Sequence, residues 1–329
     1  MINRTLEVFN SLQKGDSPKA LELINMPDTD LNASTTKPII GSYFRLIHTI
    51  IFFDRSDLLR ILIEKGVDLS LKDSSNISPI CAAITYNQTE SAKILLENEA
   101  KIDEDEEIIL MNSASRNNNL ELVKLLVSKG IDVNPRGLYS TTPLHEVCGL
   151  MRGNSDLVKY LLTKGAIVNA IDTNGNTPLH SACKSGSIEI VKLLYIAGAN
   201  IFAKNIYDET PLWAAVNYVK LSSSINYYVP QIHEIVNFMI PWGANISDTH
   251  QGNSLMDVLM DIHSRANEKN KEDITLSIHY LHYADKILGG GIFFSYSDDY
   301  VSHITNKEYN HELIGGHFLD WSESLYNVE

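Results

Sequence analysis

Apolar and polar positions along the chain recur in a pattern of two short helices followed by a turn. The clearest copy runs from 172 to 200, where a glycine turn and a Thr-Pro helix start precede a short helix of small residues. A second helix follows, with apolar residues at 188, 191, 193 and 194, and it ends at Gly198. This unit has apolar residues on more than one face and too little mass to cover them, so it folds only when it is stacked between copies of itself.

The second helix of this unit occurs six times without gaps. Its copies begin at 57, 90, 121, 156, 189 and 234, which are 33, 31, 35, 33 and 45 residues apart. Five copies end at a glycine, which tolerates the left-handed backbone that terminates a helix. These glycines are Gly66, Gly130, Gly165, Gly198 and Gly243.

A second motif marks the helix starts in phase with this period. Thr-Pro-Leu-His stands at 142–145 and at 177–180, and partial copies stand at 78–81 and 210–213. Such a period with this motif is the ankyrin signature, and the chain resembles the ankyrin repeat family over residues 37–260. The resemblance implies an all-α solenoid of stacked helix pairs with β-hairpin loops and degenerate caps at both ends.

The resemblance also predicts how the chain is divided. Residues 1–36 are predicted to form a degenerate N-terminal capping repeat, with Ser17 as the cap of its second helix. Residues 37–266 are predicted to form an array of about six to seven repeats, with an insertion near 216–233 that separates two helices or lengthens them. Residues 267–329 are predicted to hold a capping helix from 274 to 288 and a non-repeat tail.

The third repeat departs from the pattern. Acidic residues at 103–107 replace its hairpin tip, and no Thr-Pro follows them. Five carboxylates in a row could engage a basic partner or a cation, whereas a solvated loop needs neither. Because no regular ligand spacing accompanies the run, the sequence favours the solvated loop.

Composition narrows the classes of partner. A net charge of −14 opposes binding to phosphate backbones and to anionic membranes, so we expect neither nucleic acid nor a membrane as partner. No apolar run is long enough to span a bilayer, and the first residues lack the apolar core of a secretory signal. Three cysteines, predicted at corresponding first-helix positions, indicate reduced core thiols and a cytoplasmic protein. They are Cys81, Cys148 and Cys183.

Histidines carry little evidence for chemistry. The resemblance implies that His48, His145 and His180 bond to neighbouring backbone and tie one hairpin to the next. The five histidines nearest the C-terminus, at 279, 282, 303, 311 and 317, match no established metal signature, so we predict no metal and no cofactor. Trp213 replaces the motif histidine beside the insertion, and it is predicted to fill the space that a longer helix leaves.

The resemblance implies where a partner binds. Ankyrin proteins usually hold partners with their hairpin tips and the exposed side of their first helices, which form a concave surface. Counted from each Thr-Pro, these positions are Leu138, Tyr139, Leu150, Thr173, Asn174, Asn176, Lys184, Ser185, Ile206, Tyr207, Glu209, Asn217 and Tyr218. Tyrosine offers contact area with few torsions and a polar tip, so Tyr139, Tyr207 and Tyr218 are the preferred candidates. The alternative is that each tyrosine packs locally on its neighbouring hairpin.

The preferred function is a non-catalytic, monomeric scaffold that binds a protein partner. The alternative is an ankyrin-guided enzyme, or an adaptor, whose activity or docking segment lies in 267–329. About 60 residues are few for an active site, and the chain contains no nucleophile elbow, phosphate loop or zinc-hydrolase motif. Fold alone does not choose a target.

The biological setting rests on composition and on the divergent ends. An excess of Ile, Asn and Lys over Ala and Arg indicates an AT-rich genome. Ankyrin arrays with such ends resemble type IV secreted effectors of intracellular bacteria, and also proteins of amoebae and large DNA viruses. The effector resemblance implies secretion into a host cell and a eukaryotic host protein as partner. It also makes Asn134 and Asn169 candidates for hydroxylation by host enzymes.

Overall fold

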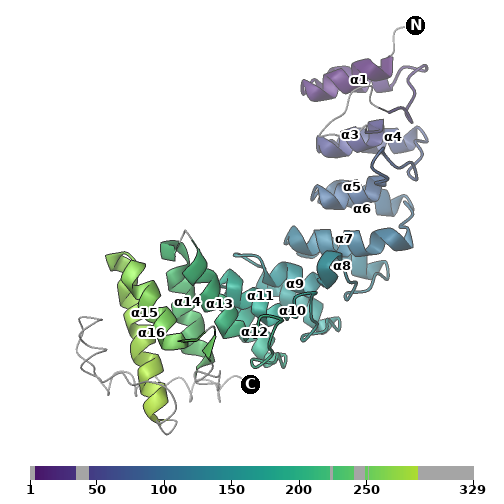
Figure 1. The fold of residues 1–329 in the computed structure, drawn as a ribbon. Helices are drawn as coiled ribbons and strands as arrows, with labels where there is room; N and C mark the ends of the chain where they lie inside the picture. The colour runs from purple at the N-terminus through teal and green to yellow at the C-terminus, as the bar shows by residue number, and fades with distance from the viewer. Residues whose placement is uncertain (1–3, 35–43, 223–224, 241–248, 251, 288–329) are drawn as a thin grey trace. The chain divides into compact units, whose positions relative to one another are not determined.

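The computed structural model describes residues 4–34, 44–222, 225–240, 249–250 and 252–287 (Figure 1). The chain divides into two compact units, Met1–Gly137 (unit 1) and Leu138–Glu329 (unit 2). This division falls inside the predicted array, between two repeats. The predicted boundaries at 36 and 266 stay predictions.

Unit 1 is a stack of helix pairs. In each pair the two helices pack on each other, the first helices pack on one another in chain order, and so do the last three second helices. The pairs are α1 (Arg4–Gln13) with α2 (Ser17–Ile24), α3 (Leu46–Phe52) with α4 (Ser56–Glu64), α5 (Pro79–Thr85) with α6 (Thr89–Glu97), and α7 (Glu104–Arg116) with α8 (Leu120–Ser128).

Unit 2 repeats this arrangement and is also built of two rows of helices. A 3-10 turn (Leu138–Ser140) precedes the first pair, and a two-stranded antiparallel hairpin, β1 (Thr249–His250) with β2 (Asn253–Ser254), precedes the last. The pairs are α9 (Pro143–Cys148) with α10 (Ser155–Thr163), α11 (Pro178–Ser185) with α12 (Ile188–Ile196), α13 (Pro211–Leu221) with α14 (Ile225–Met239), and α15 (Leu255–Arg265) with α16 (Glu268–Ile287). The predicted all-α stack of helix pairs is confirmed.

The motif histidines hold neighbouring repeats together, as predicted. Thr177 and His180 form a capping box in which the Thr177 backbone N–H donates to His180 Nδ1 over 3.0 Å. The opposite nitrogen of the ring, Nε2, donates to the Glu209 carbonyl of the next repeat over 3.0 Å. His145 and His48 make the equivalent bonds to Asn176 and Ile77, over 3.0 Å and 2.8 Å. In His145 and His180, where Nδ1 accepts a backbone N–H and Nε2 donates to a carbonyl, the ring is therefore the neutral Nε2–H tautomer.

Four of the five predicted glycine helix ends lie in the described residues, and each takes the left-handed conformation. Their φ angles are 80°, 90°, 89° and 87° at Gly66, Gly130, Gly165 and Gly198. Gly243 lies outside the described residues.

The burial of His180 makes the stability of unit 2 depend on pH in a predictable direction. Burial lowers the pKa of His180 to about 4 from its ordinary value of 6.5, against the hydrogen bond to Glu209, which raises it. Between these two values the unfolded chain binds a proton that the folded unit does not, so stability falls as the pH falls. From pH 7 to pH 5 His180 alone is expected to lower the free energy of unfolding of unit 2 by about 2 kcal/mol. His233 and His263, whose pKa values burial also lowers, act in the same direction.

Urea denaturation of the full chain at both pH values measures this drop. NMR titration of the His180 ring measures its pKa directly in the folded protein. A ring that titrates near 6.5 would contradict the prediction, whatever the denaturation curves show.

Two predicted helix starts were wrong, and the insertion follows one of its two predicted alternatives. Asp16, not Ser17, caps α2, because its carboxylate accepts the Lys19 N–H over 3.1 Å. The last helix begins at Glu268 and not at 274. The insertion lengthens helices: α13 and α14 have 11 and 15 residues, whereas α11 and α12 have 8 and 9.

The cysteines do not share one position. Cys148 and Cys183 are each the sixth residue of their helix, whereas Cys81 is the third residue of α5, where other repeats carry the motif histidine. All three thiols are buried and unbridged. Burial raises the pKa of Cys81 to about 11 and that of the other two further, which leaves them protonated and unreactive.

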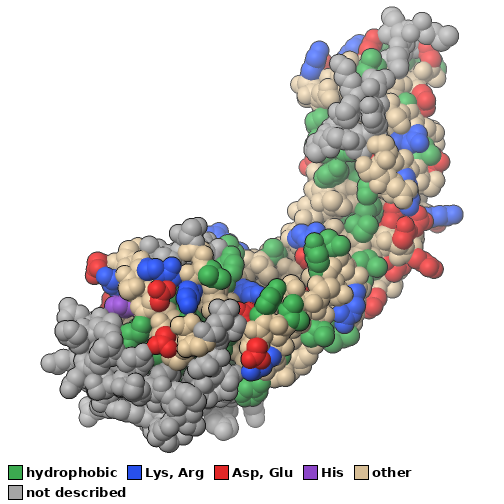
Figure 2. Space-filling model, in the orientation of Figure 1, with side chains coloured by type: hydrophobic (Ala, Val, Ile, Leu, Met, Phe, Trp, Pro, Cys, Tyr) green, Lys and Arg blue, Asp and Glu red, His purple; other side chains and the backbone are tan. Residues whose placement is uncertain are grey.

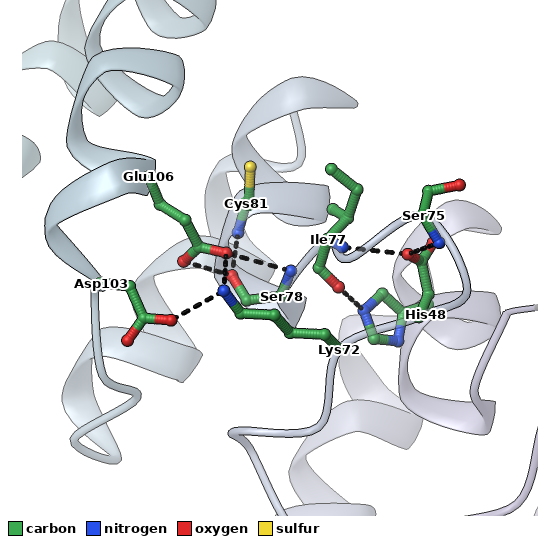
Figure 3. Close-up of polar contacts among 9 residues, drawn as sticks. His48, Lys72, Ser75, Ile77, Ser78, Cys81, Asp103 and Glu106 are labelled. Atoms are coloured by element: carbon green, nitrogen blue, oxygen red, sulfur yellow. Dashed lines mark hydrogen bonds and ion pairs between the residues drawn. The ribbon is translucent and has the colours of Figure 1, made fainter.

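The predicted solvated loop at 103–107 was also wrong. Asp103 is the N-cap of α7, and the next four acidic residues form its first turn, where carboxylates complement the helix dipole. Glu106 is buried and reaches back to the preceding repeat (Figure 3). Its carboxylate accepts the Ser78 backbone N–H over 3.3 Å and the Ser78 hydroxyl over 2.8 Å.

This contact takes the place of a motif histidine at that repeat boundary. Cys81 occupies the histidine position of α5, and the Ser78 N–H donates to Glu106. Lys72 completes the cluster, 2.8 Å from an Asp103 oxygen and 3.4 Å from Glu106. Since His48 donates to the adjacent Ile77 carbonyl, the loop before α5 is held from the repeats on both sides.

Candidate functional site

The hairpin tips of unit 2 are built by short polar side chains that bond to their own backbone. Asp172 Oδ1 accepts the backbone N–H groups of Asn174 and Asn176, each over 2.8 Å. Asn205 does the same for Tyr207 and Glu209 in the next repeat, over 2.9 Å and 3.0 Å. These bonds fold each tip into a fixed turn whose central residues point away from the stack.

Backbone hydrogen bonds join neighbouring tips into one row. The Thr173 N–H donates to the Tyr139 carbonyl over 2.8 Å, and the Ile206 N–H donates to the Asn174 carbonyl over 2.9 Å. Gly175 permits this close approach, since a Cβ on it would lie 3.2 Å from the Asn205 Cα atom and its φ is +73°. Tyr139 and Tyr207 are therefore carried by a preorganised edge.

Apolar side chains stand out from this edge. Leu138 and Tyr139 are 77% and 66% exposed, and Ile206 and Tyr207 are 64% and 58% exposed. Tyr218, on α13, is 43% exposed. Each of the three preferred tyrosines thus presents a large part of its side chain to solvent, and its role in binding a partner stays a prediction.

The remaining predicted positions divide by burial. Thr173 and Asn174 are exposed, and Leu150 and Lys184 are half-buried. Glu209 and Asn217 are also half-buried, and they bond to each other over 2.8 Å, which ties the tip to α13.

Asn176 is a correction to the predicted site. It is buried, its amide donates to Asp172 over 3.1 Å, and its side-chain oxygen accepts from Asn205 over 3.0 Å. Its backbone carbonyl accepts the His145 ring. Ser185 is likewise buried and donates to the Cys148 carbonyl. Both residues hold neighbouring repeats together and lie beneath the surface.

The structure adds residues that the sequence interpretation missed. Leu221 is 83% exposed at the end of α13, and Met151 is 44% exposed just after α9. We call the hairpin tips together with the exposed side chains of α9, α11, α13 and α15 the first-helix face of unit 2. Hydrophobic side chains reach the surface of unit 2 at several places between polar and charged ones (Figure 2). A separate exposed apolar set lies on α12 and on the loops after α10 and α12: Ile167, Ile171, Ile196 and Phe202.

The described residues contain no group of three or more His, Cys, Asp or Glu side chains that could hold a metal. No helix in this part of the chain is long and apolar enough to cross a bilayer. The side chains of His279 and His282, and all of 288–329 with its three histidines, lie outside the described residues. Asn169 is described, and its side chain bridges to Gly198 O and Asn200 N over 3.0 Å and 2.8 Å.

A family model for ankyrin repeats, in three copies, matches residues 46–137 and 110–205. Residues 46–205, just under half of the chain, are therefore similar to ankyrin repeats. An ankyrin repeat protein of Variola virus is 30% identical over 168 residues, which cover 50% of this chain and 29% of that protein. Human ankyrin repeat and SOCS box protein 3 is 30% identical over 171 residues, which are 50% of this chain and 33% of that protein. This chain thus spans a third or less of these two ankyrin relatives.

Solved ankyrin structures show the same fold. The ankyrin repeat domain of human ASB11 has a TM-score of 0.54 at 21% identity, over 68% of this chain and 96% of that one. The ankyrin repeat domain of Bcl-3 has a TM-score of 0.51 at 22% identity, over 63% and 92%. Ankyrin repeat domains are typically scaffolds for protein–protein interaction.

Proposed function

We propose that the chain is a non-catalytic scaffold that binds one protein partner on the first-helix face of unit 2. The observation that carries the proposal is the row of exposed apolar side chains on hairpin tips that backbone bonds fasten together. Exposed tyrosines on a rigid edge lose little conformational entropy on binding, because the backbone is already ordered. Exposed apolar side chains gathered in this way are typical of protein–protein interaction sites.

The setting is part of the proposal. Relatives from Variola virus and from human support a eukaryotic partner. The composition and the divergent ends support a host-directed protein that an intracellular bacterium secretes into the host cytosol. Within that cytosol we propose a monomer with no nucleic acid, membrane or cofactor bound.

Replacing the three tyrosines together tests the site. The Tyr139→Ala/Tyr207→Ala/Tyr218→Ala variant is expected to bind its partner at least about 100-fold more weakly, because aromatic anchors carry most of the energy of an interface. Affinity purification from host cytosol, with quantitative mass spectrometry of the proteins recovered on each variant, identifies the partner. Titration of that partner then measures the loss.

The control variant removes a similar amount of exposed apolar surface from the separate set on α12 and on the loops after α10 and α12. An Ile167→Ala/Ile196→Ala/Phe202→Ala variant is expected to recover the partner as the wild type does, since these residues lie outside the first-helix face. If this control loses the partner and the tyrosine variant keeps it, the proposed surface is wrong.

An adaptor is the second candidate, favoured by the relative named for a SOCS box. In that case the first-helix face would hold a target while residues within 267–329 dock a second protein. Cross-linking mass spectrometry on the full chain distinguishes the two candidates. Cross-links between 267–329 and a second protein support the adaptor. If that segment were instead an enzyme, the bound partner would be recovered in a chemically modified form.

A further inference from the structure

Basic residues recur at the C-terminal ends of the first helices in unit 2. Lys184, Lys220 and Arg265 lie in the last turns of α11, α13 and α15, and Arg152 follows α9. The chain as a whole carries a charge of −14, so a row of cations on one face runs against the overall balance.

Hydrogen bonds between successive helix ends show that these residues share one edge of the unit. The Ser185 hydroxyl at the end of α11 donates to the Cys148 carbonyl at the end of α9 over 2.8 Å. Arg265 donates to the Lys220 carbonyl over 2.7 Å, which joins the ends of α15 and α13. The helices α9, α11, α13 and α15 also pack in this order.

One nearby carboxylate pairs with a member of this row, and two others accept hydrogen bonds from uncharged groups. Asp261 pairs with Arg265 at 3.0 Å, and Glu146 accepts the Thr141 hydroxyl over 2.8 Å. Glu209 accepts the amides of Asn205 and Asn217. Within the described part of the chain, no carboxylate pairs with Lys184 or Lys220. Both are half-buried, where an ammonium group is less screened than in open solvent.

Exposed apolar side chains lie close in sequence to two of these cations. Tyr218 and Leu221 flank Lys220 on α13, and Met151 precedes Arg152. A surface of this kind complements a segment that carries carboxylates beside apolar side chains, because each cation then meets an anion while the apolar groups exclude water.

We propose that the first-helix face of unit 2 recognises an acidic segment of its protein partner, in which Asp or Glu residues alternate with apolar ones. This inference rests on the proposed function and names the chemistry of the partner. A nucleic acid would also supply anions, but its continuous phosphate charge is repelled by the acidic remainder of the chain and leaves Leu221 and Met151 unused.

A selection from a displayed library of random peptides, with the full chain as bait, tests the proposal. The enriched peptides are expected to be net negative and rich in aromatic and aliphatic residues. Fluorescence anisotropy of the labelled peptides is expected to show about 10-fold or greater weakening for Lys184→Glu/Lys220→Glu, and weaker binding at high salt. The matched control, Lys159→Glu/Lys164→Glu on and after α10, makes the same charge change outside the face, and it is expected to bind as the wild type does.

The outcomes separate this inference from the proposed function. Enriched peptides that are neutral or basic, yet lose binding in the tyrosine variant, overturn the acidic partner and leave the scaffold standing. If no enriched peptide depends on the tyrosines, both proposals are overturned. A single-stranded oligothymidine that binds through Lys184 and Lys220 more tightly than any enriched peptide also overturns the acidic protein segment. Circular dichroism confirms that each variant is folded.

Discussion

The Glu106→Ala variant is expected to lower the free energy of unfolding of unit 1 by about 2 to 3 kcal/mol. Removing the carboxylate leaves the Ser78 N–H and hydroxyl without their acceptor inside the stack, where water does not replace it. Lys72 also loses one of its two carboxylates. Because no motif histidine serves this repeat boundary, no second bond of that kind compensates. Urea denaturation followed by circular dichroism measures the loss.

Glu107→Ala is the matched control. Glu107 lies in the same first turn of α7 and feels the same helix dipole, but it is not buried. Its replacement is expected to change stability by less than about 0.5 kcal/mol. If the two variants lost equal stability, the effect would be that of the helix terminus and not of the bond to Ser78. Glu106→Gln keeps an acceptor without the charge and is expected to fall between the two.

Sequence predicted the second helices well because their pattern is local, and it predicted the bonds of the histidines to the next repeat through the resemblance to ankyrin repeats. Apolar spacing with a closing glycine defines a helix such as α12 from its own residues, and Gly198 takes the positive φ that the pattern requires. His180 works in the same way, because its capping box is formed with Thr177 three residues earlier. What a motif encodes within a few residues can be read from the chain.

The acidic run shows what local patterns leave out. Five consecutive carboxylates indicate a solvated loop when the neighbouring repeat is unknown. The structure extends α7 through them, because Ser78 supplies two donors and Lys72 a cation to Glu106. The donors come from residues about 28 positions earlier, so the helix start was decided by packing between repeats.

For the candidate site, too, the sequence predicted what depends on local spacing and missed what depends on neighbouring repeats. Counting from each Thr-Pro located Tyr139 and Tyr207 on exposed tips, since the tip has a fixed length. The same counting placed Asn176 on the surface, where Asn205 of the next repeat in fact covers it. It also missed Leu221, because α13 continues beyond the length of α11. Burial between repeats and altered helix length are not visible in a motif.

The Trp213→Ala variant is expected to destabilise unit 2 by about 3 to 5 kcal/mol. Trp213 is 1% exposed, and it lies at the third residue of α13, where α9 and α11 carry their motif histidines. Because α13 packs against α11, α14 and α15, the indole fills volume among lengthened helices. Its removal leaves a cavity that the surrounding helices only partly close. Urea denaturation monitored by circular dichroism measures the change.

The Trp213→His variant tests whether position 213 stabilises unit 2 by filling space or by bonding as a motif histidine does. If the indole mainly fills space, restoring the family residue still leaves a void, and stability is expected to fall by about 2 kcal/mol or more. Tyr207→Ala, on the exposed tip, removes a large aromatic from the same repeat and is expected to change stability by less than about 0.5 kcal/mol. Wild-type stability in Trp213→His would contradict the space-filling role. It would mean that position 213 needs only a tie to the following repeat, as position 180 does with Glu209.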